Sequence, residues 1–244
     1  MASPTPSPAS GSLVAAMVRL AGTPDHSPDL PTQMVSITRL TGERVKVARF
    51  ASITALRGKA HTTVAVSDEL IRAVDEIQYA DDAGPCLDAV DSGTPVGVPD
   101  IDATVRWPGF REVAPRLGLH ASVSVPLYSG RGAAVAALNV YGDDRAAMAP
   151  LIAGIWAVHR LTEEEGLRGE SLTGLDPGSR ELVTGYAEAL RIRSTIRLAL
   201  ETIRSDNRCS PEDAYLSLCI QAGDAGTDLA EAATTLLDRN HPPT

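Results

Sequence analysis

The chain has 244 residues, 43% of them hydrophobic, and a formal net charge of -9. No apolar run approaches the roughly 18 residues that a membrane helix needs, and residues 13–20 are too few and are interrupted by Arg19. We therefore expect no membrane span, no signal peptide and a cytoplasmic location. The acidic balance argues against broad nonspecific attachment to nucleic acid, because that affinity comes largely from neutralised phosphates.

The first third of the chain predicts a tail, a short helix and three strands. Residues 1–12 are rich in Ser, Pro, Ala and Gly, which is typical of a disordered tail. We expect a short helix over residues 13–21, followed by a Pro-rich connector to Pro31. Alternating or β-branched residues predict strands, with Thr41-Gly42 as a turn between the first two. The expected strands are 34–40, 45–50 and 62–66; the segment between the last two fits no single pattern.

The next part of the chain predicts helices, then a hairpin, then a helix. Ser67-Asp68-Glu69 and Gly84-Pro85 are helix-start signals. The inward positions of these two helices are Leu70, Ile71, Val74, Ile77, Cys86, Leu87 and Val90. The elements expected after them are a strand at 96–98, a helix at 107–117, a hairpin of 122–128 with 133–142 around Gly130-Arg131-Gly132, and an amphipathic helix at 148–160. This order predicts an α+β fold with an antiparallel sheet and flanking helices.

Several stretches of this region resemble the GAF domains of actinobacterial regulators. They are DEIQY (75–79), AGPCLDAV (83–90), RWPGF (106–110), VPL (125–127) and ALNVYG (137–142). The resemblance implies a sensory or dimerising domain, which we place at residues 13–165, and a small-molecule ligand is a partner consistent with it. It does not name that ligand.

Residues 166–180 are expected to form a linker that ends where Asp176-Pro177 starts a helix. Leu182, Tyr186 and Ala189 then form an apolar seam suited to a partner helix. Together with the GAF resemblance, this seam leads us to expect a homodimer.

Residues 191–238 predict three short helices that pack as a small all-helical module, within a domain placed at 181–241. Ser210-Pro211-Glu212-Asp213 is a capping box for the second helix, Gly223 is its expected end, and Thr227 is the expected cap of the third. The inward positions are Ile192, Ile196, Ala199 and Ile203 in the first helix, Ala214, Tyr215, Leu218 and Ala222 in the second, and Leu229, Ala232, Ala233 and Leu236 in the third.

This apolar pattern resembles the ANTAR domain, a three-helix RNA-binding module of bacterial transcription antiterminators. The matching positions are Ile196, Ala199, Ala214, Tyr215, Leu218, Leu229 and Ala233. The resemblance implies structured RNA as a partner and a function in transcription antitermination. The polar face departs from the family pattern at Leu200-Glu201, Cys219, Ala222 and Asp228. The alternative is therefore a degenerate ANTAR-like module for protein interaction or dimerisation without RNA binding.

Four arginines of the first of these helices are the predicted RNA-binding residues: Arg193, Arg197, Arg204 and Arg208. On a helix they fall within about 60° of one another. Leu200 interrupts this stripe, and Glu201 is placed to pair with Arg197 or Arg204. The competing interpretation is a solvated face of ion pairs, since acidic residues outnumber arginines from Asp176 onward.

No arrangement of residues typical of an enzyme is found, so we expect no catalytic residues, no metal site and no cofactor. The three cysteines are widely spaced and no CxxC is present, which predicts neither a disulfide scaffold nor a zinc site. Cys86 at a helix N-terminus would have a lowered thiol pKa and act as a redox switch, or it is a small buried residue.

Two further groups have both a functional and a structural interpretation. Tyr79, Trp107 and Phe110 either line a ligand pocket or pack in the core. The acidic residues Asp81, Asp82, Asp100 and Asp102 either act as paired carboxylates or serve as helix caps and solvated turn residues.

Overall fold

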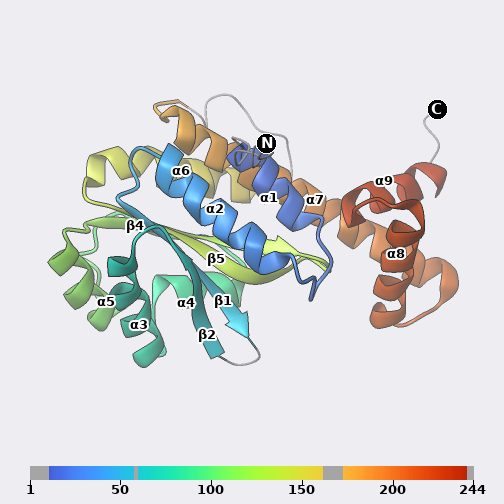
Figure 1. The fold of residues 1–244 in the computed structure, drawn as a ribbon, viewed down its shortest axis with the longest axis horizontal. Helices are drawn as coiled ribbons and strands as arrows, with labels where there is room; N and C mark the ends of the chain where they lie inside the picture. The colour runs from blue at the N-terminus through green and yellow to red at the C-terminus, as the bar shows by residue number, and fades with distance from the viewer. Residues whose placement is uncertain (1–10, 58–59, 162–172, 241–244) are drawn as a thin grey trace, which may run out of the picture.

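The molecule consists of one antiparallel sheet with helices on both faces and a helical extension at its C-terminal end (Figure 1). A computed structural model describes residues 11–57, 60–161 and 173–240. The predicted α+β class is confirmed. The strands are β1 (Phe50–Arg57), β2 (Ala60–Val66), β3 (Val96–Val98), β4 (Ala121–Ser129) and β5 (Ala133–Gly142), in the order β2-β1-β5-β4-β3.

The hairpin of β4 and β5 forms the centre of the sheet and was predicted with nearly the same bounds. Its turn places Gly130 at φ 48° and Gly132 at φ 80°, a left-handed conformation that glycine adopts without steric cost. β5 pairs on its other side with β1, from Phe50 opposite Tyr141 to Ala55 opposite Ala136. This turn extends toward the helical extension (Figure 1).

One face of the sheet carries four helices: α1 (Leu13–Ala21), α2 (Leu30–Arg44), α6 (Arg145–Leu161) and the first half of α7 (Pro177–Asn207). Their apolar stripes meet the sheet in one core that includes Ile37, Ile53, Leu138 and Ile155, each with 0% exposure. We call this side the helical face. Segments from both ends of the sequence are needed to cover it.

The opposite face carries shorter helices: α3 (Arg72–Ala80), α4 (Pro85–Ser92) and α5 (Pro108–Val113), with 3₁₀ turns η1 (Glu69–Ile71) and η2 (Ala114–Leu117). Their starts were predicted: Asp68 accepts a hydrogen bond from Leu70 N, and Pro85 lies in the first turn of α4. Leu70 itself is exposed rather than inward. We call this side the polar face, because α3 buries Asp75 and Gln78 against the sheet.

The strand predicted at 34–40 is wrong, because these residues lie inside helix α2 and Thr41-Gly42 is not a turn. Met34, Ile37 and Thr41 are buried and recur at helical spacing, which puts Met34 and Ile37 on one helix face but on opposite faces of a strand. Pro31 in the first turn is a helix-start signal that the strand interpretation overlooked.

The strand predicted at 45–50 is also wrong, since β1 begins only at Phe50. The segment that fitted no pattern, after residue 50, forms that strand. β2 at Ala60–Val66, β3 at Val96–Val98 and α6 agree with their predicted positions.

Helix α7 is continuous over 31 residues, so no new helix begins at residue 191. Its first half packs in the core of the helical face through Leu182, Val183 and Tyr186. The predicted dimer seam is therefore covered within the same chain, with Leu182 and Tyr186 at 0% exposure and Ala189 at 5%. The change from one core to the next occurs inside α7, after Leu190, rather than at residue 181.

The second half of α7 packs with α8 (Pro211–Ala225) and α9 (Leu229–Asn240) around a separate core. We call residues 191–240 the helical module, and the sheet with its surrounding helices up to Leu190 the sheet body. Ser210 caps α8 by accepting from Asp213 N at 3.1 Å, as predicted. Two end signals were wrong. Gly226, not Gly223, ends α8 at φ 65°, and Asp228, not Thr227, caps α9 by accepting from Glu231 N.

Most of the predicted tail lies outside the described residues, which begin at Gly11. Of the predicted linker, residues 166–172 lie outside them, whereas 177–180 form the first turn of α7 and so are helix rather than linker. Among the described residues, no helix combines the length and hydropathy required to cross a membrane.

Candidate functional site

The four arginines predicted to bind RNA lie on one side of α7 but do not form one free surface. Arg193 donates from Nε to the carbonyl oxygen of Gly132 at 2.7 Å, and its guanidinium lies 4.3 Å from the centroid of the Tyr128 ring. A cation over an aromatic face gains electrostatic attraction in addition to the hydrogen bond. Arg193 is thus held by the β4–β5 turn of the sheet body.

Arg197 lies with its aliphatic stem near the same turn, and the residue is exposed. A Cβ at Gly132 would lie 2.9 Å from Arg193 Cγ and 3.4 Å from Arg197 Cγ. Gly132 is therefore required here both for its positive φ and for the close approach of α7. The turn and the arginine stripe fit against each other.

The second half of the stripe faces solvent. Arg204 pairs with Glu201 at 2.9 Å, one of the two pairings that the sequence allowed, while Leu200 packs against the core of the helical module. Arg208 ends α7 in a left-handed conformation, φ 51°, and is exposed. Among the described residues, Arg197 and Arg208 are the members of the stripe without a hydrogen-bond or ion-pair partner.

The loop between α1 and α2 forms a second contact with the helical module. The carbonyl oxygen of Gly22 accepts from Leu229 N at 3.1 Å, at the start of α9. The amide of Asp25 donates to the hydroxyl oxygen of Tyr215 at 2.7 Å. Burial raises the pKa of Tyr215, so the phenol is neutral at physiological pH. These backbone hydrogen bonds fix the loop against both α8 and α9.

Arg131, in the β4–β5 turn, connects the two contacts. Its Nε donates to Asp25 Oδ2 at 3.1 Å, a terminal nitrogen lies 3.7 Å from Glu212 Oε1, and the guanidinium stacks 5.0 Å from the Tyr215 ring centroid. Asp25 also accepts from the hydroxyl of Ser129 at 3.3 Å. Arg131 therefore contacts the turn, the α1–α2 loop and α8 at once.

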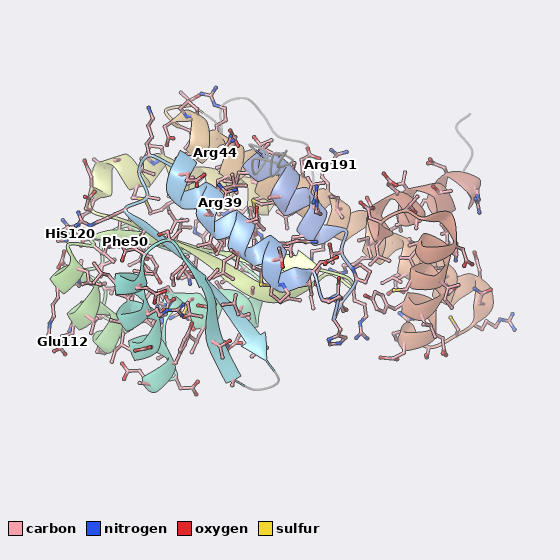
Figure 2. All side chains as sticks on the ribbon, in the orientation of Figure 1. Arg39, Arg44, Phe50, Glu112, His120 and Arg191 are labelled. Atoms are coloured by element: carbon pink, nitrogen blue, oxygen red, sulfur yellow. The ribbon has the colours of Figure 1, made fainter. Side chains whose placement is uncertain are left out.

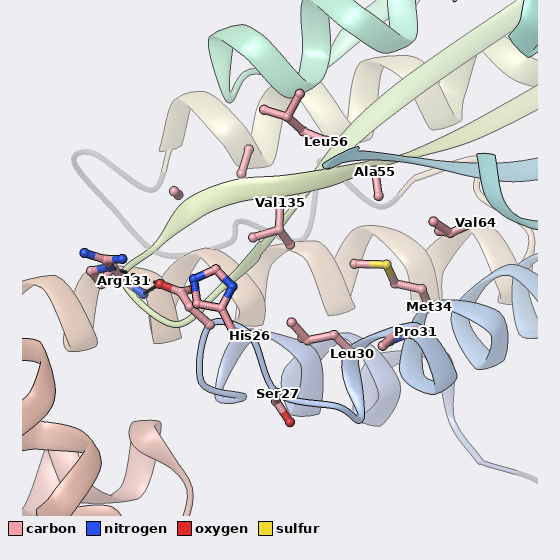
Figure 3. Close-up of a pocket in the computed structure, with 13 residues that line it drawn as sticks. His26, Ser27, Leu30, Pro31, Met34, Ala55, Leu56, Val64, Arg131 and Val135 are labelled. Atoms are coloured by element: carbon pink, nitrogen blue, oxygen red, sulfur yellow. Dashed lines mark hydrogen bonds and ion pairs between the residues drawn. The ribbon is translucent and has the colours of Figure 1, made fainter. Parts of the chain in front are cut away.

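A cavity of about 500 Å³ opens beside this junction, between α2 and the sheet (Figure 3). Its walls are mainly apolar and its polar residues gather at one end, where Figure 3 shows His26 beside Arg131. His26 has φ 64°, which is uncommon for a residue other than glycine. The apolar walls include Leu30, Pro31, Met34, Ala55, Val64 and Val135.

The polar face of the sheet contains a buried carboxylate. Asp75, with 0% exposure, accepts hydrogen bonds from the hydroxyls of Ser52 (3.1 Å), Thr63 (2.9 Å) and Tyr141 (2.9 Å). Burial raises the pKa of Asp75 to about 6, and these three hydrogen bonds counteract part of that rise. The carboxyl group therefore titrates closer to neutral pH than an exposed aspartate does.

The hydrogen bonds around Asp75 continue across the sheet to Asn139. The Asn139 side-chain amide donates to Ser52 and Thr54 at 3.1 Å each, and the Tyr79 hydroxyl lies 2.9 Å from Thr54 and 2.8 Å from Thr63. Because Thr63 donates to Asp75, it accepts from Tyr79, which in turn accepts from Thr54. Each hydroxyl in this chain therefore donates to the next group in the direction of the Asp75 carboxylate.

The structure favours the structural interpretation of Cys86 and of the aromatic residues. Burial raises the pKa of the Cys86 thiol, the opposite of the lowering expected at a helix start. Phe110 and Trp107 pack in the core of the polar face, with 0% and 7% exposure. Tyr79 belongs to the hydrogen-bond network just described.

The acidic residues considered as paired carboxylates pair with basic residues or lie at helix ends. Arg145 contacts both Asp100 and Asp102, and Asp102 also lies 2.9 Å from His120 Nδ1. Asp81 follows the last residue of α3. Among the described residues, no group of three or more His, Cys, Asp or Glu side chains could hold a metal ion.

Sequence reasoning missed Asp25, His26 and Arg131. Arg131 was identified only as the centre of a hairpin turn, and the loop with Asp25 only as a connector. The available signal was weak: charged residues in a turn rich in glycine and in a loop that prolines bound. Their meeting depends on how three distant segments pack, which no local pattern encodes.

Comparison with solved structures finds similar chains at low identity. A type II free methionine-R-sulfoxide reductase of Thermoplasma acidophilum is 13% identical, with TM-score 0.40, covering 72% of this chain and 95% of that chain. A protein of Burkholderia vietnamiensis described as a GAF sensor is 13% identical, with TM-score 0.42 and coverage of 72% and 90%. The nlh2 GAF domain of A. aeolicus is 10% identical, with TM-score 0.40 and coverage of 74% and 94%.

No curated protein matches the sequence. The family model described as GAF domain matches residues 31–157, which is more than half of the chain and includes all five strands. The sheet order and the helices on both faces agree with that assignment. The chain belongs to the GAF domain family.

Proposed function

We propose that this protein is a non-catalytic cytoplasmic regulator. In this proposal the GAF domain senses a small molecule, and the helical module, an ANTAR-like unit, binds structured RNA in nascent transcripts and thereby promotes antitermination. The three-helix arrangement of α7, α8 and α9 around the predicted apolar positions supports an ANTAR-like module.

The arginine stripe of α7 is the observation that carries the RNA proposal. Arg197 and Arg208 are exposed and lie three helical turns apart, within about 20° of each other around the axis. Arg193, on the same side, is held by Gly132 and Tyr128 of the GAF domain. Among the described residues of the stripe, Arg197 and Arg208 are therefore the two free cations of the docked module, and release of Arg193 from the β4–β5 turn adds a third.

This count gives a measurable salt dependence. Each neutralised phosphate of a single-stranded segment contributes about -0.7 to the slope of log affinity against log salt, so two arginines predict a slope near -1.4. Fluorescence anisotropy of a labelled RNA hairpin, titrated with the full chain at several salt concentrations, measures it. We expect weak binding, which the double substitution Arg197→Ala with Arg208→Ala abolishes.

A matched control removes two arginines elsewhere. Arg39 and Arg116 are exposed and pair with Glu43 and Glu112, and Figure 2 shows Arg39 and Glu112 on the GAF domain, away from the module. Arg39→Ala with Arg116→Ala changes the net charge equally and should leave RNA affinity near that of the wild type. An equal loss in both double variants, or no binding at low salt, argues against an RNA surface on α7.

A second candidate function is protein interaction by the helical module. Leu216 and Ile220 lie four residues apart on one face of α8 and are 59% and 53% exposed. Adjacent exposed apolar residues are typical of interaction surfaces. If the protein is a homodimer, this face is a candidate interface, because the seam at Leu182 and Ala189 is covered within the chain.

Sedimentation distinguishes this second function. Leu216→Glu with Ile220→Glu should convert a dimer to a monomer without changing RNA affinity if this face is the interface. A wild-type protein that sediments as a monomer, or a variant that stays dimeric, would exclude α8 as the dimer surface.

A further inference from the structure

The cavity between α2 and the sheet has the size and lining of a small-molecule site. Its volume of about 500 Å³ lies within the range of roughly 300–1,000 Å³ usual for ligand sites. Leu30 and Met34 of α2 form one wall, and Ala55 and Val135 of the sheet form the other (Figure 3). Such walls favour an apolar ligand body.

The polar end of the cavity offers free N–H donors on Arg131 to a carboxylate. Asp25 already accepts hydrogen bonds from Ser129 and from Arg131, so its oxygens are engaged within the protein. Arg131 uses only Nε in a side-chain hydrogen bond; one terminal nitrogen lies 3.7 Å from Glu212 Oε1, and the guanidinium carbon lies over the Tyr215 ring. Guanidinium has five N–H donors, so donors are left for a carboxylate. His26 stands beside it at the same end.

We propose that this cavity is the ligand site of the GAF domain and that it takes a small amphipathic carboxylate. The apolar body lies between α2 and the sheet, and the carboxylate binds Arg131. The inference rests on the sensing part of the proposed function and is independent of RNA binding.

The position of the site explains how a ligand bound in the cavity could affect the contacts of the helical module. Arg131 and Asp25 line the cavity and also contact α8 through Glu212 and Tyr215. A carboxylate on Arg131 competes with Glu212 for the same guanidinium. Ligand binding thereby acts directly on the contact that docks the module, without requiring movement in the rest of the sheet.

Isothermal titration calorimetry of the full chain with octanoate and with 1-octanol tests the proposal. The two probes share an alkyl chain and differ in the charged group. We expect octanoate to bind about tenfold or more tightly than octanol, because a hydrogen bond to a charged group is stronger than one to a neutral group. Arg131→Gln should bring octanoate down to the affinity of octanol, while Arg116→Gln, which removes a distant exposed arginine, should not change it.

Filling the cavity gives a second, independent test. Val135→Trp places a large side chain between α2 and the sheet and should abolish binding of both probes, with a thermal melt to confirm that the variant is folded. Should it not fold, the Arg131→Gln comparison still decides the proposal. Equal affinity for the two probes in the wild type, or no octanoate binding at all, would overturn it.

Hydrogen exchange locates the bound probe. Octanoate should slow amide exchange in residues 30–34 of α2 and 133–135 of β5, which line the cavity, and leave residues 72–80 of α3 unchanged. Protection of α3 instead would place the ligand on the polar face and overturn this site. Because these measurements contain no RNA, their failure leaves the RNA proposal standing, and failure of RNA binding leaves this site standing.

Discussion

The two faces of the sheet solve the problem of burial differently. On the helical face, helices from both ends of the chain cover the strands with apolar side chains, and its buried hydroxyls, such as Thr38 and Thr41, donate to carbonyls of their own helix. On the polar face, Asp75 and Asn139 are held in a network that crosses three strands and α3.

The two faces should therefore differ in how they affect the free energy of unfolding and its dependence on pH. Burial of apolar area is insensitive to pH, whereas a buried carboxyl group makes stability depend on its protonation. The helical face should therefore set how stable the domain is, and the polar face should set how that stability varies with pH.

The largest effect is expected from breaking the helical face. Leu182→Ala empties a fully buried position of α7 and should lower the free energy of unfolding by about 2–5 kcal/mol. Leu198→Ala, on the same helix but 58% exposed, is the matched control and should change it by less than about 0.5 kcal/mol. Urea unfolding followed by circular dichroism measures both. Similar small effects would mean that α7 does not pack on the sheet in solution.

The next effect concerns Asp75. Its pKa is about 6 in the folded protein against an ordinary value of 3.8, so between these values the folded state holds a proton that the unfolded chain has lost. The free energy of unfolding therefore falls as the pH rises through this window. Asp75→Asn removes that dependence, and its stability relative to wild type should rise by on the order of 3 kcal/mol from pH 4 to pH 7.

Unfolding at a series of pH values checks the sign as well as the size. Asp224→Asn, at an exposed position of α8, is the control and should show no such trend. A relative stability of Asp75→Asn that is flat or falling with pH would contradict the raised pKa.

The smallest effect compares one hydroxyl from each face. Ser52→Ala removes a donor to Asp75 and an acceptor for Asn139, and should cost about 1–3 kcal/mol at neutral pH. Thr38→Val removes a hydroxyl that donates only to the carbonyl of Met34, within its own helix, and should cost less than about 1 kcal/mol. Thermal unfolding of the two variants compares their losses of stability. A larger loss for Thr38→Val than for Ser52→Ala would contradict the proposed difference between the faces.

Local signals predicted the elements that local interactions determine. Gly-Pro before α4, the Gly-Arg-Gly turn of the hairpin and the Ser-Pro start of α8 each fix a boundary within a few residues. Helix α2 was missed because Met34 to Leu40 alternates like a strand and also repeats like a helix. Contacts with α1 and the sheet decide between these two periods, and a local window contains neither.

The candidate site shows the same limit. Periodicity placed the four arginines on one side of α7, and it identified Glu201 as a partner for Arg197 or Arg204, of which the structure shows Arg204. It did not reveal that Arg193 is engaged by the carbonyl of Gly132 and the ring of Tyr128, because those residues lie some sixty positions away in the chain. Asp75 was seen only as part of a motif, since nothing in its neighbours marks it as buried.

Helix α7 belongs to both cores, and this has a consequence for how the protein tolerates change. Its 31 residues span about 46 Å at 1.5 Å each, with Arg191, labelled in Figure 2, at the crossing point. A residue inserted there would rotate the module by about 100° relative to the GAF domain, leaving each core whole but separating Arg193 from Gly132. The number of residues at that point of α7 therefore fixes how the module is rotated about the helix axis relative to the GAF domain. An insertion of seven residues nearly restores the rotation but moves the module by about 10 Å along the axis, so it too should separate Arg193 from Gly132.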